Sequence, residues 1–358
     1  MVDSRRDALG SGGTRGVPGR IFPGLGDLPA QLATAVEEIT QVDGGNPHHP
    51  LHSEVRPAFS CNPMADQAVR GGFLYNHAMS PDHDFHLHST ASDGTLPPSE
   101  LVERAAAAGI RTLALTDHDT TEGVAEAAQA ALGLGLRFVP GVEISVTWGG
   151  MTVHVVGLGI DPQDAALQDG LAGLRGFRDW RAEEIGRRLA KDGIPHTFER
   201  ARALSNGRLI SRTHFARVLV ELGRAESVRD VFRRYLVRGR PGHVPGQWAP
   251  LGEAVEWITG AGGQAVIAHP ARYPLNRGQL RRLGQEFRAA GGVGFEVVSG
   301  SHSADDNRLM AIHAQGLGLL ASIGSDYHGP GQSYLELGRL PALPPGCTPL
   351  WQGEALAA

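Results

Sequence analysis

The fold is decided near residue 84, where the sequence reads DFHLHSTASDG from Asp84 to Gly94. Successive side chains of an extended strand point to opposite sides, so His86 and His88 are predicted to lie on one side and to reach one point in space. Two imidazoles, followed five residues later by the carboxylate of Asp93, suit a borderline metal ion such as Zn²⁺, Mn²⁺ or Fe²⁺. Paired histidines are also common on protein surfaces, so the prediction of a metal site depends on the rest of the chain.

Length and composition are those of a globular protein. The 358 residues suffice for one large barrel or for two domains, and 41% of them are hydrophobic. The two cysteines, Cys61 and Cys347, form no CxxC pair and suggest no disulfide framework, which is typical of a reducing cytosol. No apolar run reaches the roughly 18 residues of a membrane span, and the Gly/Pro-rich N-terminus lacks the apolar core of a signal peptide. We therefore predict a cytoplasmic location.

Short apolar strands alternate with helices from residue 84 onward. Strands are predicted over 110–116, 136–139, 142–146, 153–160, 264–268, 294–298 and 319–323, and helices over 98–109, from 121, and over 253–261, 279–290 and 304–315. This alternation predicts a parallel, barrel-like α/β fold, in which the chemistry takes place at the carboxyl ends of the strands.

One long segment interrupts the alternation. Residues 166–245 predict only amphipathic helices, over 171–190, 213–222 and 228–237. The predicted organisation is a barrel formed by 82–165 and 246–345, an inserted basic helical cap domain at 166–245, and a tail at 346–358. Residues 1–81 lack sustained periodicity and are predicted to be a disordered or poorly ordered extension, with one short helix over 28–39. Met79 precedes the first strand closely, so whether residues 1–78 belong to the native protein stays open.

Charge is distributed unevenly along the chain. Residues 166–245 contain 17 Arg and Lys against 9 Asp and Glu, a net charge of +8. The whole chain has a net charge of −5, so the remaining residues together carry −13. An acidic body beside a basic segment is what a metal–carboxylate centre next to a polyanion-binding surface would need. An Arg-rich solvated helical face explains the same composition, and both interpretations stay open.

Potential metal ligands recur at the predicted strand ends. They are His86, His88, Asp93, His118, Glu143, His154, His269, Asp326 and His328. Nine ligands exceed what one tetrahedral ion takes, which indicates two or three metals sharing a bridging carboxylate. Taken alone, His154 or His269 would be interpreted as a core histidine hydrogen-bonded to the backbone.

Six motifs resemble those of the PHP (polymerase and histidinol phosphatase) metallophosphoesterases. They are DFHLHSTASDG at 84–94, LTDHD at 115–119, GVEIS at 141–145, VHVVG at 153–157, AHP at 268–270 and GSDYH at 324–328. Within the helical segment, SRTHFAR at 211–217 and YLVRG at 235–239 are similar to the bacterial branch that contains ribonuclease AM and the 3′,5′-nucleoside bisphosphate phosphatase.

The resemblance implies a distorted (β/α)7 barrel with three divalent ions, commonly Mn²⁺, with Zn²⁺ or Fe²⁺ as alternatives. It implies one ion on His86, His88, Glu143 and Asp326, a second on Glu143, His154 and His269, and a third on Asp93, His118 and His328. Asp117 and Asp119 either orient imidazoles or cap the turn. The sequence has no G-x-S-x-G or P-loop pattern, so no catalytic group is predicted beyond a metal-bound hydroxide.

Several arginines are candidates for substrate binding. Arg178 and Arg181 lie three residues apart on one helix face, and with Arg212 and His214 they could form a fork for a 5′-phosphate. Arg272 is a further candidate. The alternative is that these are ordinary solvated side chains.

The predicted activity is metal-dependent hydrolysis of the 3′-phosphoester of 5′-phosphorylated nucleotides. The substrate is either a 3′,5′-bisphosphate or 5′-monophosphorylated RNA degraded from 5′ to 3′, and neither a membrane nor an obligate protein partner is predicted. The alternative enzyme is a small-molecule phosphatase of histidinol-phosphate type. A metal-stabilised interaction module and a sequence-nonspecific RNA-binding protein are the non-enzymatic alternatives.

Overall fold

The computed structural model describes residues 82–206 and 208–352. The predictions made for residues 1–81, including the short helix over 28–39, lie outside this described part, as do residues 353–358 of the predicted tail.

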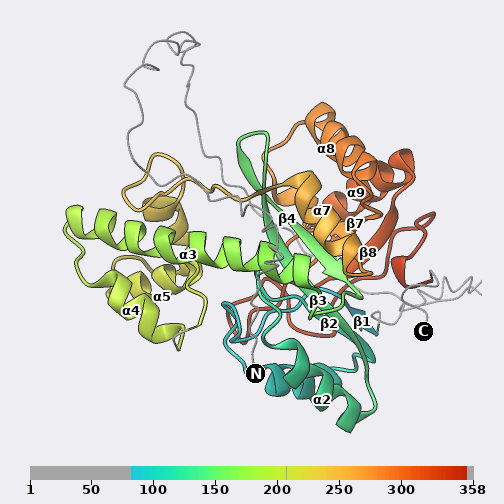
Figure 1. Ribbon diagram of the computed structural model, residues 1–358, viewed down its shortest axis with the longest axis horizontal. Coiled ribbons are helices and arrows are strands. Elements are labelled where there is room, and N and C mark those ends of the chain that lie inside the picture. Colours follow the sequence, from blue (N-terminus) through green and yellow to red (C-terminus); the bar gives the residue numbers. More distant parts are fainter. Residues whose placement is uncertain (1–81, 207, 353–358) are drawn as a thin grey trace, which may run out of the picture. The chain divides into compact units, whose positions relative to one another are not determined.

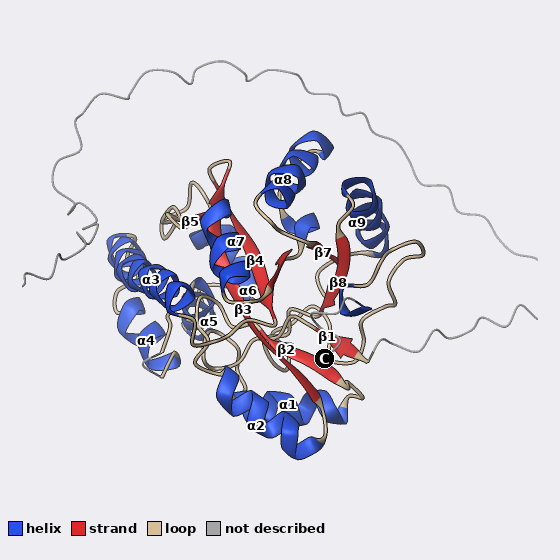
Figure 2. Ribbon diagram, turned by 45° about the vertical axis from the view of Figure 1, so that its right-hand side comes forward, coloured by secondary structure: helices blue, strands red, loops and turns tan. Residues whose placement is uncertain are grey.

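One curved sheet organises the barrel. Its strands follow one another in chain order as β1 (His83–Asp84), β2 (Thr112–Leu115), β3 (Arg137–Trp148), β4 (Met151–Leu158), β6 (Gln264–Ile267), β7 (Gly294–Ser299) and β8 (Leu320–Gly324), and β5 (Ala249–Pro250) pairs with β3. The two ends of this series meet, because the amide of Phe85 donates to the carbonyl of Ile323 over 3.1 Å and that of His88 donates to Tyr327 over 3.0 Å. The sheet is therefore a nearly closed barrel (Figure 2), and the predicted α/β barrel class is confirmed.

The prediction that every strand is parallel was wrong. β4 is antiparallel to both β3 and β6, whereas the other neighbours in the series are parallel. Gly149 and Gly150 join β3 to β4 with φ angles of 57° and 76°, and such a two-residue turn connects adjacent antiparallel strands. The two strands predicted at 136–139 and 142–146 are one continuous strand, β3.

Five helices cover the outside of the barrel. They are α1 (Pro98–Ala107), α2 (Val124–Leu134), α7 (Leu251–Gly260), α8 (Arg277–Ala289) and α9 (Ala304–Leu317), with short 3₁₀ turns at Pro270–Arg272 and Leu350–Gln352. α1 and α2 pack against each other and share a hydrophobic cluster with β2 around Leu101, Leu113 and Leu115, and the others enclose a larger core that contains Ile267 and Phe295. Hydrophobic burial thus stabilises the sheet from its outer side and leaves the carboxyl ends of its strands for polar residues.

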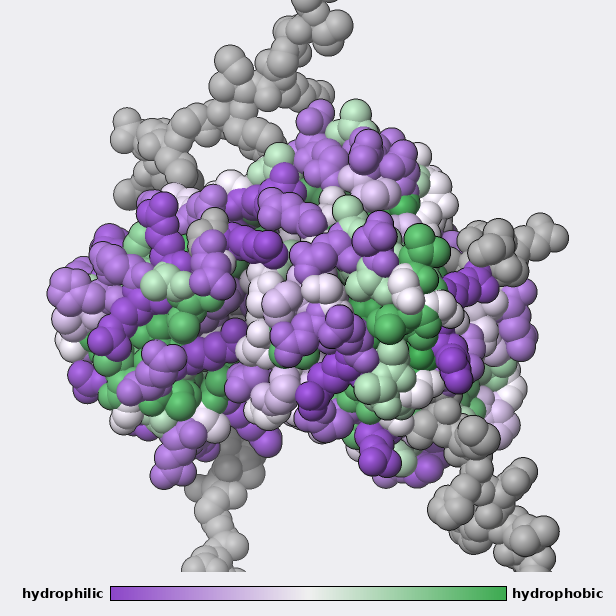
Figure 3. Space-filling view, turned by 90° about the horizontal axis from the view of Figure 1, so that it is seen from below, coloured by the Kyte–Doolittle hydropathy of each residue, from purple (hydrophilic) through white to green (hydrophobic). Residues whose placement is uncertain are grey.

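The helical segment forms its own hydrophobic cluster. It comprises α3 (Ala165–Lys191), α4 (Thr197–Leu204), α5 (Arg212–Glu221), α6 (Val228–Val231) and a π-helical turn, η1 (Phe232–Leu236). α4 was not predicted, and the single helix predicted over 228–237 is α6 followed by η1. Figure 1 shows α3, α4 and α5 together at one side of the barrel strands. Hydrophilic residues cover most of the face seen from below, with smaller apolar areas (Figure 3). Among the described residues, no helix has both the length and the apolar character needed to cross a bilayer.

Candidate metal centre

Glu143 lies at the centre of a cluster of imidazoles. Its Oε2 atom is 3.3 Å from the Nε2 atoms of both His86 and His88 and 2.7 Å from Nδ1 of His118. Its Oε1 atom is 2.8 Å from Nδ1 of His154 and 3.1 Å from Nε2 of His269. Glu143 and these five histidines are six of the nine predicted ligands. Glu143 is fully buried in the middle of β3, which explains how one carboxylate meets five rings.

Two further carboxylates complete the cluster. Oδ1 of Asp326 lies 3.2 Å from Nε2 of His88 and 3.6 Å from Nδ1 of His328. Oδ1 of Asp93 lies 3.2 Å from Nε2 of His328 and 3.9 Å from Nε2 of His118. All nine side chains predicted as ligands therefore converge, from positions 242 residues apart at the extremes, at the end of the barrel where β3, β6 and β8 place their polar residues.

The cluster contains three groups of donor atoms that lie within 4.8 Å of one another. They are His88, Asp93, His118 and His328; His86, His88 and Asp326; and His118, Glu143 and His154. The grouping differs from the sets that the resemblance implied: His88 and His118 each belong to two groups, Glu143 is not grouped with His86 and Asp326, and His269 belongs to none of the three.

The donor atoms themselves indicate that the cluster fits cations. Nε2 of His86, both ring nitrogens of His88, Oδ1 of Asp93 and Oε2 of Glu143 are buried and have no hydrogen bond within the described structure. A buried polar atom without a hydrogen bond costs about 1–3 kcal/mol, so several of them close to one another fit a site in which they would coordinate ions.

Electrostatics supports the same interpretation. Burial by itself would raise the pKa of Glu143, but the imidazoles of His118 and His154 outweigh it and hold the pKa well below its usual range. Burial by itself would lower the pKa of His88, but the carboxylates of Asp326 and Glu143, 3.2 and 3.3 Å from its Nε2, raise the pKa to about 10. The buried carboxylates therefore stay ionised, and their negative charge favours a nearby positive charge. Divalent ions would supply that positive charge and would leave the imidazoles neutral.

Backbone strain is concentrated at the site. Asp119, His269 and Asp326 are non-glycine residues with φ angles of 50°, 30° and 55°. This left-handed region is unfavourable for residues with a Cβ atom, and in proteins it is found mostly where a functional geometry requires it.

Glu296 is a site residue that the sequence analysis missed. Its carboxylate lies 3.1 Å from Nδ1 of His86 and accepts a hydrogen bond from the amide of His269 over 2.5 Å. It thereby directs Nε2 of His86 toward Glu143. A Cβ atom on Gly324 would come within 2.3 Å of Glu296 and 2.2 Å of His86, so only glycine allows β8 to approach this pair. A carboxylate inside the otherwise apolar strand 294–299 was the available signal.

The two aspartates that flank His118 hold loops and an arginine. Asp117 accepts hydrogen bonds from the amide and the hydroxyl of Ser89, at 2.8 and 2.6 Å, and so fixes the loop after His88. Asp119 accepts a hydrogen bond from the amide of Ser145 and another from Nε of Arg178 over 2.6 Å. Neither carboxylate contacts an imidazole nitrogen in the described structure, so the interpretation that they orient imidazoles is not supported.

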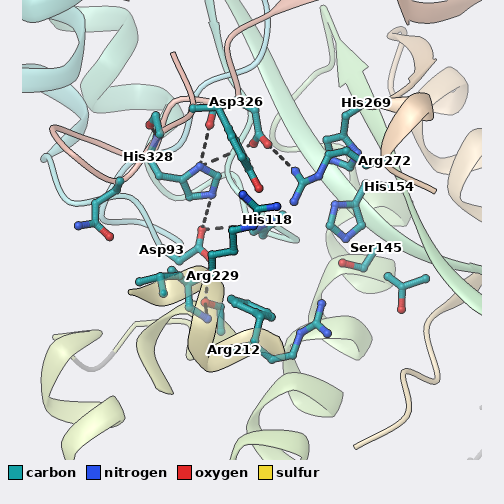
Figure 4. Close-up of a pocket in the computed structure, with 18 of the residues that line it drawn as sticks. Asp93, His118, Ser145, His154, Arg212, Arg229, His269, Arg272, Asp326 and His328 are labelled. Atoms are coloured by element: carbon teal, nitrogen blue, oxygen red, sulfur yellow. Dashed lines mark hydrogen bonds and ion pairs between the residues drawn. The ribbon is translucent and has the colours of Figure 1, made fainter. Parts of the chain in front are cut away.

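A cavity of about 720 Å³ opens beside the cluster. It is lined by ligand residues and by residues of the helical segment, and Figure 4 shows Arg212 and Arg229 together on one side of it, with Asp326 and His269 on the other. Five arginines line it, namely Arg178, Arg181, Arg212, Arg229 and Arg272. Such an accumulation of positive charge beside a carboxylate-rich cluster favours an anionic ligand.

The arginines are held in place by different partners. Arg178 is buried and also donates to the hydroxyl of Ser145 over 2.9 Å, while Arg181 donates to the carbonyl of Val244. Their guanidinium carbons lie 5.0 and 5.2 Å from the ring centroid of Trp248. Burial, with the charges of Arg212 and Arg178, lowers the pKa of Arg181 to about 8. An anion bound between these groups would relieve that repulsion.

Arg212 and His214 play different parts. Arg212 lines the cavity and forms no ion pair within the part of the chain that the structure describes; its guanidinium lies over the ring of Phe232 at 5.4 Å. His214, in contrast, is buried and is not part of the cavity lining; its Nδ1 accepts a hydrogen bond from the amide of Ser211 in the capping box of α5. His214 is therefore not included in the proposed phosphate-binding group. Arg272 lines the cavity and bonds Oδ2 of Asp326 over 2.8 Å.

Comparison with known proteins identifies the family. The PHP domain family model matches residues 84–235. The 3′,5′-nucleoside bisphosphate phosphatase of Chromobacterium violaceum is 53% identical over 270 residues, which are 75% of this chain and 95% of that protein. The chain belongs to the PHP family.

Other PHP relatives agree with this assignment. The 5′-3′ exoribonuclease Rnm of Escherichia coli is 43% identical over 272 residues, covering 75% of this chain and 92% of that protein. Among solved structures, a Chromobacterium violaceum protein described as an amidohydrolase with bound sulfate and no metal superposes with a TM-score of 0.75 at 52% identity, over 77% of this chain and 96% of that one. A putative metal-dependent phosphoesterase from Bifidobacterium adolescentis gives a TM-score of 0.64 at 30% identity, over 75% and 92% of the two chains.

Some residues of this PHP site lie outside the six motifs. Tyr273 accepts a hydrogen bond from the amide of His154 over 2.8 Å and donates to the carbonyl of Ala268 over 3.0 Å, which ties β4 to the loop of His269. Ser211, at the start of α5, donates to Oδ2 of Asp93 over 2.8 Å. These contacts join segments far apart in the sequence, and no local pattern predicts them.

Proposed function

We propose that this protein is a metal-dependent phosphoesterase that hydrolyses the 3′-phosphoester of 5′-phosphorylated nucleotides. The observation that carries this proposal is the adjacency, within one cavity, of the carboxylate–histidine cluster and a group of arginines. Relatives named as a 3′,5′-nucleoside bisphosphate phosphatase and as 5′-3′ exoribonucleases support the same substrate class.

The nine clustered side chains would hold the divalent ions. We propose three ions, with manganese as the preferred metal. Bound there, divalent ions supply a water of lowered pKa and offset the negative charge on the phosphoryl oxygens. Glu296 keeps Nε2 of His86 directed into the cluster, and Asp117 keeps the loop of His88 in position.

The arginines would hold the end of the substrate that does not react. Arg178 is oriented by Asp119 and Ser145, so its guanidinium is fixed before a ligand arrives. Arg212 forms no ion pair with a carboxylate among the described residues, so its guanidinium can bind phosphate oxygens in bidentate fashion. With the 5′-phosphate on this fork, the 3′-phosphoester of the same nucleotide lies at the ligand cluster.

One geometry then serves two substrates. Water adds to the phosphorus and the bond from phosphorus to O3′ breaks, while O3′ leaves as a hydroxyl group after taking up a proton. From a 3′,5′-bisphosphate this releases inorganic phosphate. From RNA it releases a 5′-mononucleotide and leaves a new 5′-phosphate on the shortened chain, which allows the next 5′→3′ step.

The proposal is tested by combining metal analysis with hydrolysis assays on the purified protein. We expect bound divalent metal and turnover of both adenosine 3′,5′-bisphosphate and a 5′-phosphorylated oligoribonucleotide. The matched controls are adenosine 3′-monophosphate and the same oligonucleotide with a 5′-hydroxyl, which should react far more slowly. Equal rates with and without the 5′-phosphate would contradict the proposed recognition.

The histidinol-phosphate type of phosphatase is the second candidate. A small amino-alcohol phosphate does not need five arginines around the cavity, so the lining favours the nucleotide substrate. Preferential hydrolysis of histidinol phosphate over adenosine 3′,5′-bisphosphate would reverse this choice. We further propose that residues 166–245 act as an inserted domain that carries the phosphate fork, and that the enzyme works in the cytoplasm.

A further inference from the structure

Tyr334 occupies an unusual position for an aromatic side chain. It exposes 66% of its surface, and among the large hydrophobic side chains that the described residues expose it is the one that lines the cavity. The others, such as Leu132 and Ile312, lie elsewhere on the surface. Single exposed apolar side chains are normal in proteins, so it is the placement of this ring beside the reaction site that needs an explanation.

The ring is oriented from one side by an arginine. The guanidinium carbon of Arg272 lies over the ring of Tyr334 at 6.0 Å from its centroid, and Arg272 is itself fixed by its bond to Asp326. This cation–π contact holds the ring near the cluster, while the residue as a whole stays largely exposed and lines the cavity. The Tyr334 hydroxyl forms no hydrogen bond with the described residues, so the ring is not held there for its polar group.

Tyr334 and Arg178, one member of the proposed phosphate fork, adjoin different members of the ligand cluster. Arg178 bonds Ser145, which pairs with His154 across β3 and β4. Tyr334 is joined instead to Asp326, through the arginine described above. Asp326 and His154 belong to separate candidate metal groups. A nucleotide whose 5′-phosphate is held by Arg178 and whose 3′-phosphate lies at the cluster would therefore leave the Asp326 side of the cavity, with Tyr334, to the nucleotide that follows.

We propose that Tyr334 stacks on the base of the nucleotide immediately downstream of the scissile bond and thereby makes the enzyme favour RNA ends over 3′,5′-bisphosphates. This inference rests on the proposed function. Base stacking on an aromatic side chain changes affinity by roughly 5- to 100-fold and tolerates any base, because every base has a π-face. A 3′,5′-bisphosphate has no downstream base and cannot gain from this contact.

The test is a double-mutant cycle between the ring and the base, measured on the metal-loaded full-length enzyme. Three substrates are compared: adenosine 3′,5′-bisphosphate, the 5′-phosphorylated dinucleotide of two adenylates, and the same dinucleotide with an abasic second residue. The variants are Tyr334→Ala and Tyr334→Phe, with Leu132→Ala on α2, outside the cavity, as the control for loss of an exposed apolar side chain.

For the wild type we expect kcat/KM to be about 5- to 100-fold higher with the second base than without it. Tyr334→Ala should reduce this ratio to about 1 and lower turnover of the dinucleotide much more than turnover of the bisphosphate. Tyr334→Phe and Leu132→Ala should keep the wild-type ratio.

Two results would overturn the inference while leaving the proposed function intact: a wild-type ratio near 1, or equal losses on all three substrates in Tyr334→Ala. A wild-type enzyme that hydrolyses none of the three would overturn the proposed function and this inference together.

Discussion

The hydroxyl of Ser211 donates a hydrogen bond to Oδ2 of Asp93, with 2.8 Å between the two oxygens. Ser211 is also the N-cap of α5, where its Oγ accepts a hydrogen bond from the amide of Thr213. The other carboxylate oxygen of Asp93 faces His328 in the ligand cluster. One side chain thus joins a proposed metal ligand to the helix that begins with Arg212. The proposed metal cluster and the proposed phosphate-binding arginine are therefore linked through Ser211.

Ser211→Ala should therefore affect both stability and metal retention. Loss of the cap should lower the free energy of unfolding by about 1 kcal/mol. Freeing Oδ2 of Asp93 should also weaken the metal group that contains this residue. Ser303→Ala, at the N-cap of α9, is the matched control because Ser303 does not contact the cluster. Urea denaturation and metal content after dialysis would be measured, and equal metal content in the two variants would refute the connection.

Glu296→Gln should weaken metal binding without unfolding the protein. The amide side chain keeps one acceptor oxygen for His269 but loses the charge that orients His86. Loss of such an orienting partner typically reduces metal affinity by roughly 10- to 100-fold. Competition with a chelator measures this affinity. Glu256→Gln, an exposed position on α7, should behave as the wild type. Unchanged affinity in Glu296→Gln would show that His86 needs no orienting carboxylate.

Arg212→Ala should distinguish recognition of the 5′-phosphate from general phosphoesterase activity. A charge-assisted contact contributes about 1.5–3 kcal/mol, so kcat/KM for adenosine 3′,5′-bisphosphate should fall by roughly 10- to 100-fold. Hydrolysis of a generic aryl phosphate should change little. Arg200→Ala, exposed on α4, is the control for loss of positive charge from the helical segment. Equal losses on both substrates would refute the anchoring role.

His214 makes stability depend on pH in a predictable direction. Burial lowers its pKa to about 4, and its Nδ1 must stay unprotonated to accept the hydrogen bond from Ser211. The folded-state pKa is below the unfolded value of about 6.5, so this stability is complete above pH 6.5 and is lost as the pH falls toward 4.

His214→Gln preserves a capping-box side chain but does not titrate. Between pH 7.5 and 5 the wild type should lose about 2 kcal/mol more of its unfolding free energy than this variant does. Chemical denaturation at the two pH values measures the difference. Parallel losses in the two proteins would show that His214 does not titrate as described.

The sequence was most informative where local periodicity determines the direction in which side chains point. Strand alternation predicted that His86 and His88 share one side, and both Nε2 atoms do lie 3.3 Å from Glu143. The ends of apolar runs likewise indicated His118 and Asp326. Local patterns do not encode pairing direction, and the antiparallel β4 was missed, although the Gly149–Gly150 turn was a usable signal.

Contacts made over long sequence separations were beyond sequence reasoning. Glu296 lies inside a strand, whereas the apolar runs of the sequence indicate only residues at strand ends. The contact between Ser211 and Asp93 spans 118 residues. His214 was grouped with the arginines because of its position in the sequence. In the first turn of α5, however, its ring lies back against the start of the helix and accepts the capping hydrogen bond from the amide of Ser211.

The shared position of Glu143 has a consequence for how the enzyme acquires its ions. Because one carboxylate faces five imidazoles, cations bound beside it would share its negative charge, and their sites would not fill independently. The first cation to bind would reduce the charge available to those that follow and repel them, so later cations should bind more weakly, and an enzyme starved of metal would consist largely of partially loaded molecules.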